Sequence, residues 1–263
     1  MSAPVRCEIA DGVATVVMDR PDAMNALDLA MKVALRDTLR AVADDPTVRA
    51  VVLTGSGRAF CAGQDLKEHA DNLAALPIET VWSTVAAHFA PIAMLLATMP
   101  KPVVAAVNGV AAGAGASIAF ACDFRVVADT AGFNLAFTGI GLSADTGASW
   151  TLPRLVGRAK ALELLITPRT VRADEARTLG LATDVVPAAH LGSAVAELAR
   201  RLADGPTAAY AAVKEAVMFS STHGLAESLA YEGELMARTG GTDDHRRAVA
   251  SFLAKETPGF NGR

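Results

Sequence analysis

Apolar residues alternate with polar ones near the N-terminus and recur at helical spacing further along the chain. From Cys7 to Met18 the alternation crosses an Asp11-Gly12 turn, which is typical of a β-hairpin. Between Leu27 and Asp44 apolar side chains recur every three or four positions with charges opposite, so an amphipathic helix is expected, with Asp28 near its start. The β-branched run from Val48 to Thr54 is too short for a helix and predicts a strand.

The same succession of strand, loop and helix recurs in the middle of the chain, although no sequence repeat is visible. Helices are expected over Thr80 to Thr98 and over Ala111 to Cys122, the second being rich in small residues that suit tight packing. Buried strands are expected over Val103 to Val107 and over Phe124 to Ala128. The pattern predicts a mixed α/β fold built from stacked units.

The character of the chain changes after Pro187, where three helices follow one another without strands. They are expected over Leu191 to Leu202, Pro206 to Ser220 and Leu225 to Thr239. We therefore expect a core over residues 1–195 and a C-terminal helical oligomerisation region over residues 196–263. The apolar surface of this tail predicts an assembly interface, with packing back onto the core as the alternative; its members are Leu225, Leu229, Met236, Phe252 and Leu253.

Composition and charge narrow the class of protein. The 263 residues are 52% apolar and 20% charged, as in a globular protein with a substantial core, and the net charge of −4 gives no footprint for nucleic-acid binding. Cys7, Cys61 and Cys122 are odd in number and form no CxxC pair, so we expect reduced, structural thiols in a cytoplasmic protein. The apolar stretch from Pro102 to Cys122 is interrupted by Asn108 and by glycines, so no membrane span is expected there.

Two loops that contain glycine each lie between a predicted strand and a predicted helix. They are Gly55 to Leu66 and Asn108 to Ser117. Glycine lets a backbone approach a ligand closely, and a helix N-terminus offers unpaired N–H groups, so two such loops facing each other would bind an anion. Taken singly, each loop could equally be a plain turn or a site of close packing. No GxGxxG or GxxxxGK[ST] motif accompanies them.

Several ordered motifs extend from about Cys7 to the C-terminus. They are RPDAMNAL from Arg20, VVLTGSGRAFCAGQDLKE from Val51, KPVVAAVNGVAAGAGASIAFACDFRVVAD from Lys101, GLSADTGASWTLPRLVGRAKALELL from Gly141 and the tail SFLAKETPGFNGR. In these motifs the chain resembles the crotonase superfamily of enoyl-CoA hydratases and isomerases. The resemblance implies an α/β fold, a spiral of repeated ββα units with a C-terminal helical region.

The resemblance also implies a site for an acyl-CoA thioester. The backbone N–H groups of Gln64 and Ala114 would hold the thioester carbonyl; an alanine at position 114 removes no backbone donor, although its methyl group would narrow the site. No separate cofactor and no metal is expected, because coenzyme A enters as part of the substrate. The implied substrate and coenzyme A contacts are Met24, Ala26, Ala62, Gly63, Asp65, Leu66, Lys67, Gly113, Phe137, Phe252 and Lys255.

The acid and base groups of the family's hydratases are missing from the matching positions. Ser117 and Phe137 stand where the resemblance implies two glutamates, and neither can act as a general base, so little simple hydratase activity is expected. Asp145 stands where relatives that isomerise acyl-CoA thioesters carry an aspartate, particularly those acting on ring-epoxidised phenylacetyl-CoA. A purely structural alternative is that Asp145 caps a helix starting at Thr146.

These residues predict an isomerase that acts on an acyl-CoA thioester through a stabilised enolate. The alternatives are a hydratase-like enzyme or thioester hydrolase, and a catalytically silent acyl-CoA binder. The resemblance implies a homotrimer or a dimer of trimers. The five histidines show no metal spacing and are expected at the surface or in packing. Residues that either line the acyl cavity or pack in the core are Trp82, Val85, Phe89, Phe137 and Trp150.

Overall fold

Two β-sheets form the core of the protein, whose computed structural model describes residues 3–263. The first sheet has the strand order β1-β2-β3-β5-β7-β10, and the second has the order β4-β6-β8-β9. The strands of the first sheet are β1 (Val5–Ala10), β2 (Val13–Met18), β3 (Ala50–Gly55), β5 (Val103–Val107), β7 (Phe124–Ala128) and β10 (Asp184–Val186). Those of the second are β4 (Ala59–Cys61), β6 (Val110–Ala112), β8 (Gly132–Asn134) and β9 (Thr170–Arg172).

The chain alternates between the two sheets and closes each turn with a helix. β3 and β4 lead to α2 (Leu66–Ala75), β5 and β6 to α5 (Ala114–Ala121), and β7 and β8 to α6 (Ala148–Val156). Each new turn adds one parallel strand to each sheet. The predicted spiral of ββα units is confirmed.

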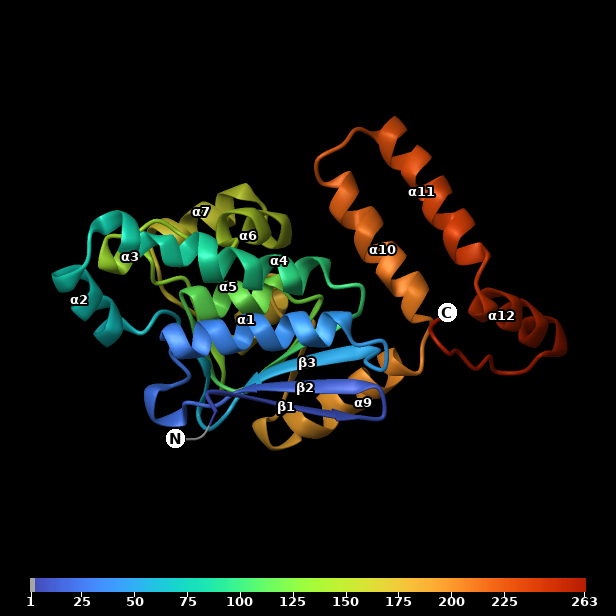
Figure 1. Cartoon of the computed structure of the whole chain (residues 1–263), viewed down its shortest axis with the longest axis horizontal. Coiled ribbons are helices and arrows are strands. Elements are labelled where there is room, and N and C mark those ends of the chain that lie inside the picture. The colour runs from blue at the N-terminus through green and yellow to red at the C-terminus, as the bar shows by residue number, and fades with distance from the viewer. Residues whose placement is uncertain (1–2) are drawn as a thin grey trace.

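Helices cover the first sheet on both faces (Figure 1). α1 (Leu29–Asp44) buries Met31, Leu35 and Leu39, and the Asp28 carboxylate accepts a hydrogen bond from the Met31 N–H at 2.8 Å, so the expected helix start is confirmed. On the other face, α9 (Leu191–Ala203) packs against β3, β5 and β7. The remaining core helices are α7 (Arg158–Ile166) and α8 (Ala173–Thr178), with short 3₁₀ turns at Pro21–Ala23, Thr138–Ile140 and Ala188–His190.

A continuous helix over Ile78–Thr98 contains one turn of π-helix. It consists of α3 (Ile78–Thr84), the π-helical segment η2 (Val85–Phe89) and α4 (Ala90–Thr98). By length and composition this helix could cross a membrane. In the structure α4 packs against α1 and α5, and Phe89, Ile92 and Leu96 are buried in the core.

The predicted helix over Ala111 to Cys122 is wrong at its start. Val110 to Ala112 form β6 and pair with β4 and β8, so the helix α5 begins only at Ala114. Gly113 separates them with φ 50° and ψ −123°, a backbone conformation outside both strand and helix. A run of small apolar residues suits a buried strand and a buried helix equally well, and the hydrophobic pattern alone could not find the boundary.

The C-terminal helices α10 (Thr207–Ser220), α11 (Leu225–Gly240) and α12 (Asp243–Ala254) project away from the core (Figure 1). The first two match the predicted helices, whereas α12 was not predicted. The expected boundary between residues 195 and 196 falls inside α9, which is a single helix packed on the sheet. The chain leaves the core after α9, near Gly205.

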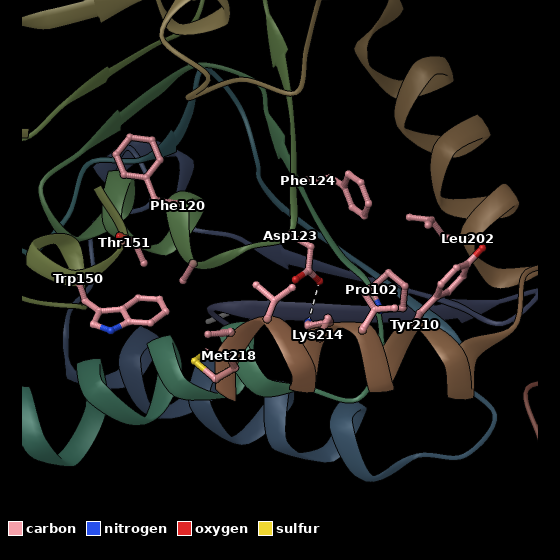
Figure 2. A pocket seen from close by; sticks show the side chains of 14 residues that line it. Pro102, Phe120, Asp123, Phe124, Trp150, Thr151, Leu202, Tyr210, Lys214 and Met218 are labelled. Carbon is pink, nitrogen blue, oxygen red and sulfur yellow. Dashed lines mark hydrogen bonds and ion pairs between the residues drawn. The ribbon is translucent and has the colours of Figure 1, made fainter. Parts of the chain in front are cut away.

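One ion pair attaches α10 to the core (Figure 2). Lys214 Nζ lies 2.7 Å from Asp123 Oδ2 and also donates to the backbone oxygen of Lys101 at 3.0 Å. Asp123 also accepts a hydrogen bond from the Val103 N–H at 2.7 Å. Burial raises the pKa of Asp123, and the ammonium of Lys214 opposes that rise.

Lys214→Met should therefore destabilise the fold, because it leaves the Asp123 carboxylate partly buried without its cation. We expect a loss of about 1–3 kcal/mol in the free energy of unfolding, measured by urea denaturation. Lys160→Met, which removes an exposed pair with Glu163, is the matched control and should change little. Equal losses in the two variants would contradict the anchoring role of Lys214.

Candidate active site

The two glycine loops meet because glycine lets their backbones approach closely. A Cβ atom at Gly63 would lie 2.7 Å from the Ala112 oxygen and 3.3 Å from the Ala114 nitrogen. A Cβ atom at Gly115 would lie only 2.2 Å from the Cys61 oxygen, so the N-terminus of α5 rests directly on the first loop. No other residue leaves this space free.

Two side-chain amides, the buried Asn25 and the partly buried Asn108, hold the first loop in its conformation. Asn25 Nδ2 donates to the oxygens of Ser56 and Ala59, at 2.9 and 2.8 Å. Asn108 Nδ2 donates to the oxygens of Gly57 and Ala59, at 3.0 and 3.2 Å. The asparagines of the RPDAMNAL and VNG motifs therefore fix the loop that carries Gly63.

Two backbone N–H groups in these loops are available to a ligand by their position. Gln64 forms an isolated bridge with Leu27 in which the donors are the N–H groups of Leu27 and Asp65, so the Gln64 N–H takes no part in it. Ala114 is the first residue of α5, where N–H groups precede the first intrahelical bond. Both residues line one cavity, as the predicted pair of oxyanion donors requires.

The cavity between the loops has a volume of about 120 Å³ and is mostly apolar. Among residues 3–263, its lining includes one carboxylate, Asp145, and one imidazole, His69. Phe137 lines it, whereas Ser117 does not: the Ser117 hydroxyl is fully buried and donates to the Gly113 oxygen at 3.2 Å. The complete lining is Ala62, Gly63, Gln64, Leu66, His69, Trp82, Thr84, Phe89, Ala112, Gly113, Ala114, Ala136, Phe137, Ile140, Leu142 and Asp145.

Asp145 is held at the cavity by a strained turn. Thr146 has φ 52°, unfavourable for a β-branched residue, and its hydroxyl donates to Asp145 Oδ1 at 2.8 Å. Burial raises the pKa of Asp145, opposed by that hydrogen bond and by the positive charge of Lys32. The predicted capping role is wrong, because α6 begins at Ala148 with Gly147 at the N-cap.

Other predicted contact residues lie in or beside the cavity. Ala62, Leu66 and Gly113 line it, and the Ala62 N–H donates to the Met24 oxygen at 3.0 Å. Ala26 is buried next to the same loop. The Asp65 carboxylate accepts from the backbone N–H of Lys67, caps α2 and forms an ion pair with Arg20 at 3.0 Å. Lys67 itself is exposed at the start of α2.

Phe252 and Lys255 are not brought to this cavity within a single chain. Both belong to the end of α12, at the opposite end of the molecule from α2 (Figure 1). The Phe252 side chain is strongly exposed, at 82%. Their predicted contact with coenzyme A remains a prediction that requires another copy of the chain.

The predicted acyl wall is only partly correct. Trp82, Phe89 and Phe137 line the cavity, but Val85 does not. Trp150 lines a separate, largely apolar cleft of about 560 Å³ between the core and α10 (Figure 2). The sequence could not show on which side of α6 the indole would lie.

His69 is a cavity residue that the sequence analysis placed at the surface or in packing. Its ring lies 5.2 Å from that of Trp82, with the planes tilted by 55°. The sequence feature that could have identified His69 is its spacing from Leu66. The two residues are three positions apart in α2, on the same face, and both line the cavity.

Comparison with known proteins agrees with the fold and the paired loops. Residues 8–263 match the model of the enoyl-CoA hydratase/isomerase family. A probable enoyl-CoA hydratase from Rhodobacter capsulatus is 42% identical over 98% of both chains, and the 1,2-epoxyphenylacetyl-CoA isomerase of Escherichia coli is 38% identical over 96% of both. A solved structure assigned as an enoyl-CoA hydratase/isomerase from Mycobacterium abscessus superposes with a TM-score of 0.94 at 41% identity, covering 98% of this chain and 100% of that one.

The fold and the paired glycine loops together are those of a crotonase-type enzyme. The chain belongs to the enoyl-CoA hydratase/isomerase family. The resemblance inferred from the motifs is thereby confirmed, and an acyl-CoA substrate is consistent with this membership.

Gly63→Ala should reduce catalysis strongly, because the new methyl group would push the two loops apart. Loss of one aligned oxyanion donor lowers kcat by about 10²- to 10³-fold, and we expect a fall of that order in steady-state turnover of an acyl-CoA. Gly157→Ala is the matched control: Gly157 also has a positive φ, 77°, but no atom stands within 4 Å of its added Cβ. If Gly63→Ala lost no more activity than this control, backbone strain rather than loop separation would be responsible.

Proposed function

We propose that this protein is an isomerase that shifts a double bond, or opens and rearranges a ring, in an acyl-CoA thioester. The observation that carries the proposal is a single carboxylate, Asp145, in an apolar cavity that also contains the N–H groups of Gln64 and Ala114. One carboxylate is sufficient to move a proton between two carbons, whereas hydration must also activate a water molecule.

A 3-enoyl thioester would be isomerised by two proton transfers. The ionised Asp145 takes a proton from C2, and the electron pair of that C–H bond delocalises into the thioester as a dienolate. The N–H groups of Gln64 and Ala114 stabilise its oxygen by about 3 kcal/mol each. Asp145 then returns the proton to C4, which gives the conjugated 2-enoyl thioester.

Asp145→Asn should abolish this proton transfer and leave the fold intact. We expect isomerisation of a 3-enoyl-CoA, followed by the ultraviolet absorbance of the conjugated product, to fall by at least about 10³-fold, together with solvent deuterium exchange at C2. Ser143→Ala, on the exposed part of the same loop, is the control. Exchange at equal rates in wild type and Asp145→Asn would exclude the aspartate as the proton shuttle.

The raised pKa of Asp145 determines the pH dependence of wild-type catalysis and the expected stability of Asp145→Asn. Because the base acts when ionised, kcat/KM should rise with pH through a pKa above the 3.8 of a free aspartate and then level off. A carboxyl with a raised folded-state pKa favours folding below its unfolded pKa, and this contribution is lost as pH rises through the folded value. Asp145→Asn should therefore be no less stable than wild type in urea at pH 7, and a clear loss would contradict that environment.

Hydratase activity is the second candidate, because several relatives carry that name. His69 is the remaining cavity group able to accept a proton from water. Crotonyl-CoA tests this function, since hydration removes the absorbance of the conjugated thioester. Hydration faster than isomerisation, and sensitive to His69→Gln, would favour the hydratase.

We infer that the C-terminal helices join copies of the chain into a trimer or a dimer of trimers. Large apolar side chains on these helices are exposed, including Val213, Val217, Leu225, Leu229, Met236 and Phe252. Light scattering should give three or six times the 27.1 kDa of one chain. Leu229→Glu with Met236→Glu should lower this mass, and Ile9→Glu, at an exposed apolar site on β1, should not. A single-chain mass for the wild type would exclude the assembly.

A further inference from the structure

A buried lysine lies directly behind the wall of the acyl cavity. Lys32, in the first turns of α1, is only 2% exposed. Its ammonium donates to Thr84 Oγ1 at 3.0 Å and to Gln64 Oε1 at 3.4 Å. It lies 5.5 Å from the ring centre of Phe89. Thr84, Gln64 and Phe89 all line the cavity, and Lys32 itself does not.

The counter-ion of Lys32 is Glu68, on α2. Its Oε1 lies 3.6 Å from the ammonium, is buried and has no hydrogen bond, while its Oε2 accepts from the Leu29 N–H at 2.8 Å. Lysine is rarely buried to this extent, because removing an ammonium from water costs more than a loose ion pair returns. The contacts of Lys32 therefore indicate a role other than stabilising the fold.

Lys101 shows what a buried lysine looks like when its role is structural. It is 6% exposed, and its ammonium donates to the backbone oxygens of Val42 and Asp45 at the end of α1. These acceptors lie at the C-terminus of α1, where backbone carbonyls lack intrahelical partners and a positive charge is favoured; the Asp45 oxygen also accepts from the Val48 N–H at 3.2 Å. Lys32 caps no helix, and its shortest polar contacts are side chains of the cavity wall.

We propose that Lys32 is a positioning residue of the proposed enolate chemistry. Its ammonium holds the Gln64 side chain, and with it the residue whose N–H faces the thioester oxygen, and it places a positive charge behind the forming enolate. The inference rests on the proposed function for its substrate, although enolate stabilisation itself would serve any thioester reaction at this site.

The charges around Lys32 decide how its removal would act on pH. Burial lowers the pKa of Lys32, while Glu68, Asp28 and Asp65 oppose that shift. The pKa of Asp145 is raised by burial, and the positive charge of Lys32 in turn opposes that rise. Other charged or titratable groups in this region are Arg20, which pairs with Asp28 and Asp65, Arg36 on α1, His69 on α2 and His88 on η2. Loss of the ammonium should therefore move the pKa of Asp145 upward.

Lys32→Met tests the proposal in the full-length protein. We expect kcat for 3-enoyl-CoA isomerisation to fall about tenfold to a hundredfold, KM to change little, and the acid limb of kcat/KM to move to higher pH. Lys32→Arg, which keeps the charge, should recover part of kcat. Lys101→Met is the matched control, which should lose stability without moving the pH limb. Lys32→Met with Glu68→Gln keeps the buried site neutral, in case the single variant folds poorly.

A second readout is independent of turnover. Acetoacetyl-CoA forms an enolate that absorbs in the near ultraviolet, so the apparent pKa of the bound thioester reports directly on enolate stabilisation. It should be higher in Lys32→Met than in wild type or Lys101→Met. An unchanged enolate pKa together with an unchanged pH limb would overturn the role of Lys32. Absence of isomerisation by the wild type would instead overturn the proposed function, and the enolate titration would still decide the inference.

Discussion

The rest of this structure depends on a close contact between the backbones of the two glycine loops, which is possible because glycine has no side chain. Gly63 and Gly115 let the first loop and the N-terminus of α5 come closer than any Cβ atom would allow. Asn25 and Asn108 then hold the loop with side-chain amide hydrogen bonds to its backbone oxygens. Because the paired N–H groups belong to the backbone, both donors are present whatever side chains stand at positions 64 and 114.

Charged side chains lie both in the wall of the cavity and behind it. Asp145 lies in apolar surroundings that disfavour its ionised form, and Lys32 lies behind the part of the wall formed by Gln64 and Thr84, with Glu68 as its partner. Each of these groups would cost stability alone, and together they set the field in which a thioester would be polarised. The positive φ of Thr146 likewise costs stability, while the Thr146 hydroxyl holds the Asp145 carboxylate at the cavity.

The sequence predicted most of the scaffold and the loops but not the full wall of the site. Alternation and helical spacing found the hairpin, α1, and the helices α9 to α11, since those patterns reflect one buried face. They failed between Val110 and Ala114, because small residues fit strand and helix alike, and at Trp150, because its side of α6 depends on tertiary packing. His69 and Lys32 carried no motif, and only the folded chain shows that His69 lines the cavity and that Lys32 lies behind its wall.

The π-helical turn at Val85–Phe89 has a consequence for how this enzyme can diverge. A π turn is one residue more than an α-helix needs, and each residue of an α-helix turns the chain by about 100°. Trp82 and Thr84 precede that turn and Phe89 is its last residue, yet all three line the cavity. Deleting a single residue there would rotate Trp82 and Thr84 by about 100° relative to α4, without a change in the two glycine loops. The shape of the cavity wall therefore depends on the length of this helix as well as on the identity of its side chains.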